Sequence, residues 1–282
     1  MITATQQSYI NEFAYLPEHI VPYVTAISQA EPFLLKDFLA FVKRDHLIFI
    51  GYPLHGPFEE KQMKGILDEA VRRFKPKEVA LTAPAIPSSI IGKAPLLPDH
   101  YYRLDLSNLS VPQKTRNMIR RAMRGLRVQR VETFQEDHRQ LVNEFLNSHP
   151  VDEATQSIFK RVPEYVSSVP TAWIFEVRNQ QEKLVAFDVA EFSATYYAMY
   201  MFNFISTENH TPGASDLLLS EILNHARTEQ KKYINLGLGI NPGVTFFKTK
   251  WGGVPSFPYR FCLYSPAPRK GFAEIADLLQ KL

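Results

Sequence analysis

Residues 235–253 read NLGLGINPGVTFFKTKWGG, and this stretch is the most informative part of the 282-residue chain. It continues an apolar run that begins at Tyr233, and three glycines and a proline fall within the seven residues 237–243. Such a composition indicates a strand followed by tight backbone routing around a ligand or a neighbouring element. We expect a helix at 244–251, so the stretch predicts a strand, a glycine-rich turn and a helix in that order.

On either side of this stretch, helical and strand-like segments alternate. Apolar residues at 136–147 recur at helical spacing. The runs at 172–205 are rich in aromatic and β-branched residues and are separated by short polar turns, as in a three-strand meander. In chain order we expect helices at 136–147, 153–167, 214–230 and 272–282, and strands at 101–106, 172–177, 184–192, 196–205 and 259–264.

The N-terminal part shows a β-β-α-β pattern. Two strand-like runs at 38–42 and 47–52 flank a polar turn, a helix follows at 58–74, and a strand follows at 78–83. Residues 88–99 are rich in Ser, Pro and Gly and are typical of a connection. The sequence therefore predicts an α+β fold, with one domain at 1–98 and a second at 99–282.

Composition restricts the class of protein. A hydrophobic fraction of 45% and a charged fraction of 22% are typical of a globular protein with a sizeable core. The formal net charge of +3 does not by itself indicate a nucleic-acid or membrane partner. The single cysteine, Cys262, lies in a strand-like run, where we expect a buried, inert thiol. No apolar run approaches the roughly 18 residues that span a bilayer, so we expect a cytoplasmic protein.

Local charge is most biased in a helix expected at 113–124. Ser110 and Pro112 precede it as helix-start signals. Residues 114–124 contain five cationic side chains and no acidic one. This basic helix is either a solvated surface or a binding site for phosphate groups, which arginine recognises well.

Two of these stretches resemble one known family. Residues 234–253, with the Asn-Leu-Gly strand and the later Phe-Lys-x-x-Trp-Gly-Gly, are similar to the C-terminal signature of Fem-type transferases of the GNAT superfamily. Residues 116–125 resemble the Arg-Asn-x-x-Arg-Arg-Ala helix that opens their second GNAT domain, and residues 50–54 resemble phosphatidylglycerol lysyltransferases. The resemblance implies two GNAT-like halves, each with a mixed, mainly antiparallel sheet flanked by helices.

The resemblance also implies where a donor would bind. GNAT proteins hold a pyrophosphate in the loop between the fourth strand and the third helix, which here reads His-Thr-Pro-Gly-Ala-Ser at 210–215. A glycine at a helix start lets the backbone N–H groups approach an anion. We therefore expect Gly213, Ala214 and Ser215 to bind the cofactor, together with Asn235 and Lys248 of the Fem-like signature. The alternative is an ordinary helix start with Ser215 or Asp216 as its cap.

The catalytic candidates are three titratable residues near the expected donor site. Asp188 and Glu191 lie on a meander strand and His210 begins the loop, so each could act as a general base for an amine nucleophile. Ordinary solvent-facing strand or loop residues are the alternative for all three. The tyrosines at 196, 197 and 200 could line an acceptor pocket or belong to the core. No metal site is expected.

Three functions remain open on the sequence. The first is transfer of an acyl group from acetyl-CoA or another acyl-CoA to an amine. The second is transfer of an amino acid from aminoacyl-tRNA, with the tRNA bound through the basic helix 114–124. The third is a catalytically silent GNAT-like binding module. The acceptor could be a small-molecule amine or a cell-envelope amine, and the oligomeric state is not determined by the sequence.

Overall fold

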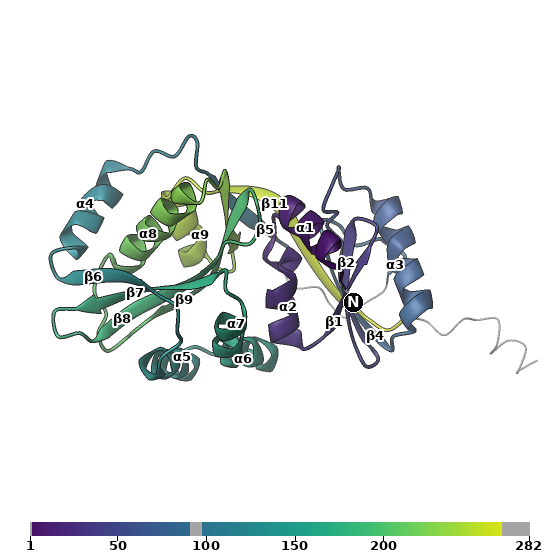
Figure 1. Ribbon diagram of the computed structural model, residues 1–282, viewed down its shortest axis with the longest axis horizontal. Coiled ribbons are helices and arrows are strands. Elements are labelled where there is room, and N and C mark those ends of the chain that lie inside the picture. Colours follow the sequence, from purple (N-terminus) through teal and green to yellow (C-terminus); the bar gives the residue numbers. More distant parts are fainter. Residues whose placement is uncertain (1, 91–97, 267–282) are drawn as a thin grey trace, which may run out of the picture.

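The structure is a computed structural model that describes residues 2–90 and 98–266. Its strands form one sheet of eleven, in the order β1-β2-β3-β4-β11-β5-β10-β9-β8-β7-β6. Figure 1 shows an elongated molecule with helices on both faces of this sheet. Among the described residues, none of the helices combines the length and the apolar character needed to cross a membrane.

The N-terminal part of the sheet is built from four strands. They are β1 (Glu31–Leu35), β2 (Phe38–Lys43), β3 (His46–Ile50) and β4 (Glu78–Ala83). The first three strands are antiparallel, and β3 runs parallel to β4 because α3 (Glu60–Phe74) makes the crossover between them. The apolar side of α3 packs on one face of these strands. The other face is covered by α1 (Ala4–Phe13), the 3₁₀ turn η1 (Pro17–His19) and α2 (Val21–Ser28).

The C-terminal part contains the remaining elements. In chain order they are β5 (Asp99–Asp105), α4 (Gln113–Ala122), β6 (Leu126–Val131), α5 (Glu136–Ser148), α6 (Glu153–Lys160), α7 (Val162–Ser168), β7 (Ala172–Asn179), β8 (Leu184–Glu191), β9 (Tyr197–Ile205), α8 (Ala214–Thr228), β10 (Tyr233–Leu238), α9 (Pro242–Lys250) and β11 (Val254–Tyr264). In Figure 1, α8 and α9 lie above the sheet, whereas α5, α6 and α7 lie below it.

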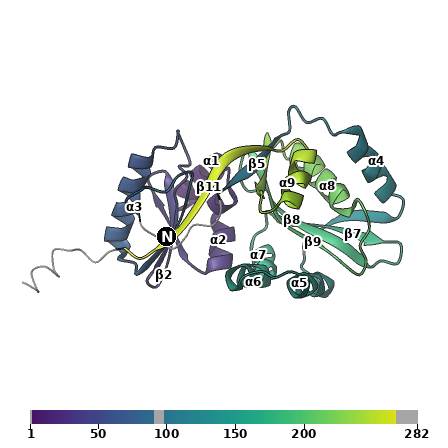
Figure 2. The same cartoon turned by 180° about the vertical axis from the view of Figure 1, so that it is seen from behind.

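The long strand β11 joins the two parts. Its first half pairs with β5, and residues 260–264 pair with β4. Figure 2 shows β11 crossing from the neighbourhood of α9 to the neighbourhood of α3. The division at residues 98 and 99 stays a prediction.

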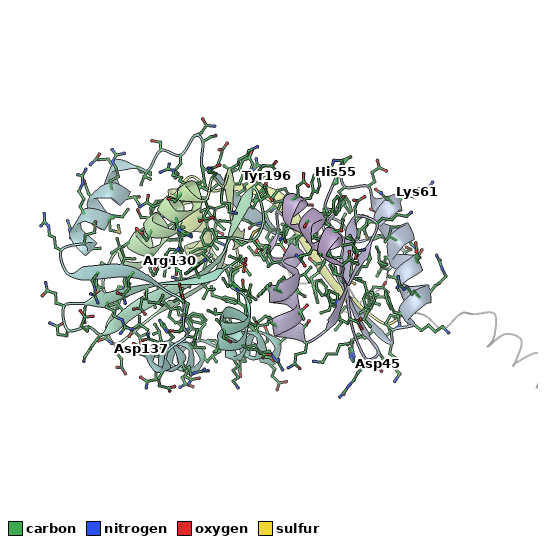
Figure 3. The ribbon with its side chains drawn as sticks, in the orientation of Figure 1. Asp45, His55, Lys61, Arg130, Asp137 and Tyr196 are labelled. Carbon is green, nitrogen blue, oxygen red and sulfur yellow. The ribbon has the colours of Figure 1, made fainter. Side chains whose placement is uncertain are left out.

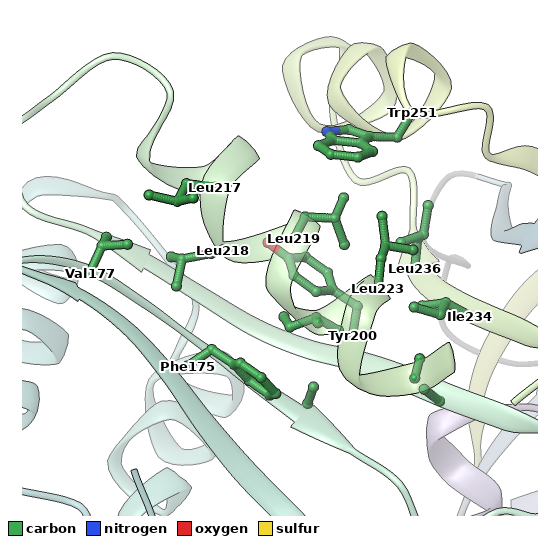
Figure 4. Packing of buried hydrophobic residues seen from close by; sticks show 14 of the residues in the cluster. Phe175, Val177, Tyr200, Leu217, Leu218, Leu219, Leu223, Ile234, Leu236 and Trp251 are labelled. Atoms are coloured by element: carbon green, nitrogen blue, oxygen red, sulfur yellow. The ribbon is translucent and has the colours of Figure 1, made fainter. Parts of the chain in front are cut away.

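The core of the C-terminal part is centred on α8. Leu217, Leu218 and Leu219 of this helix are buried with Phe175 of β7 and Trp251, which follows α9. Figure 4 shows this cluster, with Tyr200 of β9 between the sheet and the helix. Burial of these large side chains contributes roughly 1.5–3 kcal/mol each, so α8 is firmly fixed on the sheet.

The mixed α+β fold predicted from the sequence is confirmed, and four local predictions need correction or extension. The single helix expected at 153–167 is wrong: α6 and α7 meet at Arg161, because Pro163 is tolerated in the first turn of a helix but not in its interior. Strand β11 begins at Val254 rather than at residue 259. Strands β1 and β6 are the two edges of the sheet and had not been predicted. Helices α1 and α2 had not been predicted either, and the helix expected at 272–282 lies outside the described residues.

Candidate functional site

The candidate site begins where β9 and β10 stop pairing. The two strands are parallel and pair only from Tyr197 opposite Tyr233 to Met199 opposite Asn235. On its other side, β9 pairs with β8 through a β-bulge at Met201, where the register shifts. A bulge turns the strand and increases its twist, so β9 leaves β10 directly after Met199. Backbone groups between the two strands are therefore not committed to a continuous ladder. We call this separation of β9 and β10 after Met199 and Asn235 the strand opening.

Asn235 braces this point from the β10 side. Its amide nitrogen donates to the carbonyl of Tyr15 at 2.8 Å, and its amide oxygen accepts from the N–H of Gly237 at 2.8 Å. Gly237 has φ of +76°, a conformation that glycine adopts without strain. Asn235 therefore ties β10 to the segment after α1 and shapes the turn of β10, using both ends of its side chain.

Lys248 of α9 lies against the same turn. Its side chain is only 4% exposed, and its amine donates to the carbonyl of Leu238. A Cβ atom added to Gly237 would lie 3.5 Å from this amine and 3.8 Å from the carbonyl oxygen of Tyr200. Burial lowers the pKa of Lys248 to about 7, and the negative charge of Asp99 opposes this shift. Lys248 is thus a buried amine that lies against the turn of β10 and can exchange a proton at neutral pH.

The loop that enters α8 contains the other predicted donor residues. His210 is exposed, Gly213 is the N-cap of α8 with φ of +88°, Ala214 is buried, and Ser215 is half-buried. A Cβ atom on Gly213 would lie 3.1 Å from Cγ of Met118 and 3.2 Å from Cβ of Ala122. The glycine is therefore required both by its backbone conformation and by the close packing of α4, whether or not an anion binds there.

A carboxylate of the protein occupies the earlier part of the same loop. Glu144 of α5 accepts hydrogen bonds from the backbone N–H and the hydroxyl of Thr207, and the Ser206 hydroxyl lies 3.3 Å from it. These bonds lower the pKa of Glu144, although burial opposes the shift. Backbone donors that could have met a phosphate at Thr207 are thus already satisfied.

The first turn of α8 is tied to the end of α9. Asp216 is buried and accepts from Nε1 of Trp251 at 2.9 Å and from the amine of Lys250 at 2.6 Å. An acidic residue in the first turn also interacts favourably with the helix dipole. The interpretation of Asp216 as a helix cap is wrong, since Gly213 is the N-cap of α8. Its bond to Trp251 could not be predicted, because nothing local connects it with a tryptophan 35 residues later.

The three catalytic candidates lie in different surroundings. Asp188 is buried on the α8 side of β8, where Asn203 donates to its Oδ1 and Oδ2 has no hydrogen-bond partner among the described residues. Burial raises the pKa of Asp188 to about 8, and the Tyr200 hydroxyl lies beside it. Glu191 is also buried, but it accepts from the hydroxyl of Tyr165 at 2.6 Å and from two backbone N–H groups. His210 is exposed and lies in the same loop as Gly213, before α8. The three candidates therefore lie in two places, Asp188 and Glu191 on β8 and His210 in this loop.

The basic helix α4 lies at the N-terminal end of α8. Helix α4 ends at Ala122, so four of the five cations of 114–124 lie on it and Arg124 follows it. All five side chains are exposed; they are Lys114, Arg116, Arg120, Arg121 and Arg124. Figure 1 shows α4 at the end of the molecule, beside α8 and away from the N-terminal part. The positive end of the α8 dipole and this cationic surface therefore reinforce one another.

The sequence matches no known family profile and no curated protein. Solved structures with a similar arrangement include the C-terminal DUF2156 domain of an Agrobacterium fabrum protein described as a lysylphosphatidylglycerol synthetase, with 15% identity over 97% of this chain and 94% of the other and a TM-score of 0.62. FemX matches with 10% identity over 92% of this chain and 96% of the other, at a TM-score of 0.59. A GCN5-related N-acetyltransferase from Kribbella flavida matches with 12% identity over 88% and 96%, at a TM-score of 0.52.

The chain has a GNAT-like fold. The predicted resemblance to GNAT and Fem-like proteins is therefore confirmed at the level of the fold. Helix α8 follows the loop 210–215 that is expected to meet the donor. The roles of the individual site residues stay predictions.

Proposed function

We propose that this protein transfers an aminoacyl group from a charged tRNA to an amine. The observation that carries the proposal is the exposed cationic surface of residues 114–124, which comprises α4 and the turn after it. It has five positive and no acidic residues and lies beside the start of α8. A tRNA is a polyanion, and Lys and Arg side chains supply the electrostatic part of its binding. The names of the similar structures, FemX and a lysylphosphatidylglycerol synthetase, support a donor of this kind.

The transfer step follows from the position of the strand opening. The acceptor amine attacks the ester carbonyl of the aminoacyl group, the ester C–O bond breaks, and the 3′-hydroxyl of the tRNA leaves with a proton while an amide forms. A backbone N–H of β9 next to the bulge at Met201 polarises the carbonyl. Lys248, with its pKa near 7, is the group we assign to proton exchange at the leaving oxygen.

The other predicted residues receive narrower roles in this proposal. We assign Asp188 to holding a proton beside Tyr200, because its Oδ2 is free, whereas Glu191 supports α7 through Tyr165. We assign Gly213, Ala214 and Ser215 to the loop that meets the phosphates near the 3′ end, with His210 at its exposed edge. Asn235 keeps the strand opening in shape.

The test measures tRNA binding as a function of salt. One variant replaces Arg116, Arg120, Arg121 and Arg124 with Gln, and a matched control replaces the exposed cations Lys36, Arg44, Lys61 and Arg72 of the N-terminal part with Gln. Each lost phosphate contact reduces the slope of log K against log salt by about 0.7–0.9. We expect the slope of log K against log salt to be smaller in magnitude by about 3 in the α4 variant than in the parent. The control should keep the parental slope. Equal slopes in the two variants contradict the proposal.

Transfer is measured separately with tRNA charged with radiolabelled amino acids and a panel of amines. Salt-dependent binding without any transfer favours the silent binding module over the enzyme. The measurement also separates the donor class, because acyl-CoA can be supplied in place of charged tRNA.

A second candidate function is acyl transfer from a CoA thioester. The glycine-capped start of α8 favours it, since unpaired N–H groups in a first helical turn bind pyrophosphate. Calorimetry with acetyl-CoA tests it with Ser215→Glu, which places a negative charge in that turn, and with Ser220→Glu on the same helix as the control. If the parent and Ser220→Glu bind acetyl-CoA with micromolar affinity and Ser215→Glu does not bind it, the donor is CoA and not tRNA.

A further inference from the structure

A cavity of about 470 Å³ lies where the N-terminal and C-terminal parts meet. Of the three tyrosines that could line an acceptor pocket, Tyr196 and Tyr197 line this cavity, whereas Tyr200 belongs to the core around α8. The end of α1, the segment after β3, the start of β9 and the middle of β11 surround it. In Figure 3 the labelled Tyr196, one of its lining residues, lies near this junction. The volume is in the range of sites for small organic ligands.

The walls are mainly aromatic. The aromatic lining residues are Phe13, Tyr15, Tyr52, Phe58, Tyr196, Tyr197 and Phe257. Their rings are already organised, because the centroid of Tyr15 lies 4.9 Å from that of Phe257 and 6.4 Å from that of Tyr197. Tyr15 is fixed further by a hydrogen bond of 3.1 Å from its hydroxyl to the carbonyl of Pro53. A flat apolar group entering the cavity meets preformed ring surfaces, so little ordering is needed when it binds.

Among the described residues that line the cavity, Arg103 is the only cation. Its guanidinium lies 4.7 Å from the ring centroid of Tyr233 and beside the hydroxyl of Tyr197. Among the residues that the structure describes, no carboxylate comes within 4.0 Å of it, although Arg127, Arg161 and Arg178 all have such partners. A half-buried guanidinium that is stacked on a ring and lacks a counter-charge is well suited to bind an anionic group of a ligand.

We propose that this cavity binds an amphipathic anion: an aromatic or apolar group that packs on the rings, with one carboxylate or phosphate on Arg103. The aromatic rings bind the apolar part of the ligand, and the guanidinium of Arg103 binds its anionic part. Glu12, exposed at the end of α1, leaves the rim of the cavity negative. A ligand that also carries an amine can direct it toward this rim.

The cavity is close to the strand opening through two connections. Tyr197 is the first residue of β9 that pairs with β10, and Asn235 donates to the carbonyl of Tyr15. Tyr200 packs on the face of the sheet that α8 covers. Tyr197 packs on the opposite face, together with Met199 and Ala14. If the proposed transfer is right, the anion is the acceptor and its amine approaches the donor from this face. That assignment rests on the proposed function, whereas ligand binding itself does not.

Binding is tested by calorimetry with three probes and without any tRNA or CoA. The probes are 3-phenylpropionate, its uncharged amide 3-phenylpropanamide, and phenyl phosphate, which separates a carboxylate from a phosphate as the preferred anion. We expect at least one of the two anions to bind tenfold or more tightly than the amide. In Arg103→Gln this preference disappears, and in Arg103→Lys part of it returns.

The matched control is Arg73→Gln, because Arg73 also lies over aromatic rings, those of Phe33 and Phe74, but far from the cavity. This variant keeps the full preference for the anion. Phe257→Ala lowers the affinity for every probe that binds the parent, because it removes part of the aromatic wall and leaves the charge of Arg103 in place. Equal affinity for the anions and the amide, no saturable binding of either anion at millimolar concentration, or an unchanged preference in Arg103→Gln overturns the proposal. Anion binding in a protein that transfers nothing contradicts only the proposed function.

Discussion

Replacing Lys248 with methionine tests the buried amine through stability. The side chain keeps a similar length but loses the charge, and the amine is otherwise held in a site that is only 4% exposed. A fall of its pKa from 10.5 to about 7 corresponds to about 5 kcal/mol of unfavourable free energy for the charged form in the folded state. Between these two pH values the unfolded chain binds a proton that the folded chain does not bind. The free energy of unfolding of the parent protein therefore rises with pH across this window.

The expected size is about 2 kcal/mol between pH 7 and pH 9 from Lys248 alone. The assay is urea unfolding followed by tryptophan fluorescence at both pH values in the parent and in Lys248→Met. Other titrating groups are common to the two proteins, so the stability of the variant relative to the parent should fall by this amount as pH rises. Lys61→Met, which removes an exposed lysine of α3, is the control for the loss of a lysine side chain and is measured at the same two pH values. A pH-independent difference for Lys248→Met refutes the assignment of a nearly neutral amine.

Three further outcomes follow from the contacts around α8. Gly213→Ala should destabilise the protein by about 1–2 kcal/mol in thermal unfolding, because its φ is +88° and the added Cβ would lie 3.1–3.2 Å from atoms of α4. Gly65→Ala, at an open position of α3, should instead stabilise the protein by about 0.5–1 kcal/mol. Asp216→Asn should lower the free energy of unfolding by about 1–3 kcal/mol, since it leaves the amine of Lys250 without its carboxylate; an unchanged urea midpoint contradicts this. The pKa of Asp188 is about 8 in the folded state and about 4 in the unfolded chain, so the stability of the parent relative to Asp188→Asn should fall as pH rises from 5 to 7; a difference that does not change with pH contradicts this.

The sequence predicted most of the C-terminal part because its signals are local. The meander β7–β9, the helix α8 and the strand β10 each have their own periodicity and are bounded by turn residues. Helix α1 escaped prediction because Ile10 is its only buried residue, so it has almost no apolar stripe. Strand β1 contains Pro32, which is tolerated only because the strand lies at the edge of the sheet.

Contacts between distant segments could not be predicted in the same way. Gly213 was singled out as a phosphate-binding glycine, but the structure adds a second reason, the packing of α4 against it. Arg103 was not singled out, because its stacking on Tyr233 and the cavity around it depend on how β5 pairs with β10. Neither relation has a signal in the spacing of residues along the chain.

The Fem-like signature itself has a structural explanation in these contacts. Trp251 donates to Asp216 and so fastens α9 to α8. A Cβ atom on Gly253 would lie 2.8 Å from Cδ1 of Leu236 and 2.8 Å from the carbonyl oxygen of Lys248, so only glycine lets β11 leave α9 at this point. Two residues of the signature, Trp251 and Gly253, thus hold β10, α8, α9 and β11 together, and Lys248 offers its reactive group. A motif of this kind identifies the fold more strongly than the donor, and the donor is better sought in the charges of α4 and the acceptor in the cavity around Arg103.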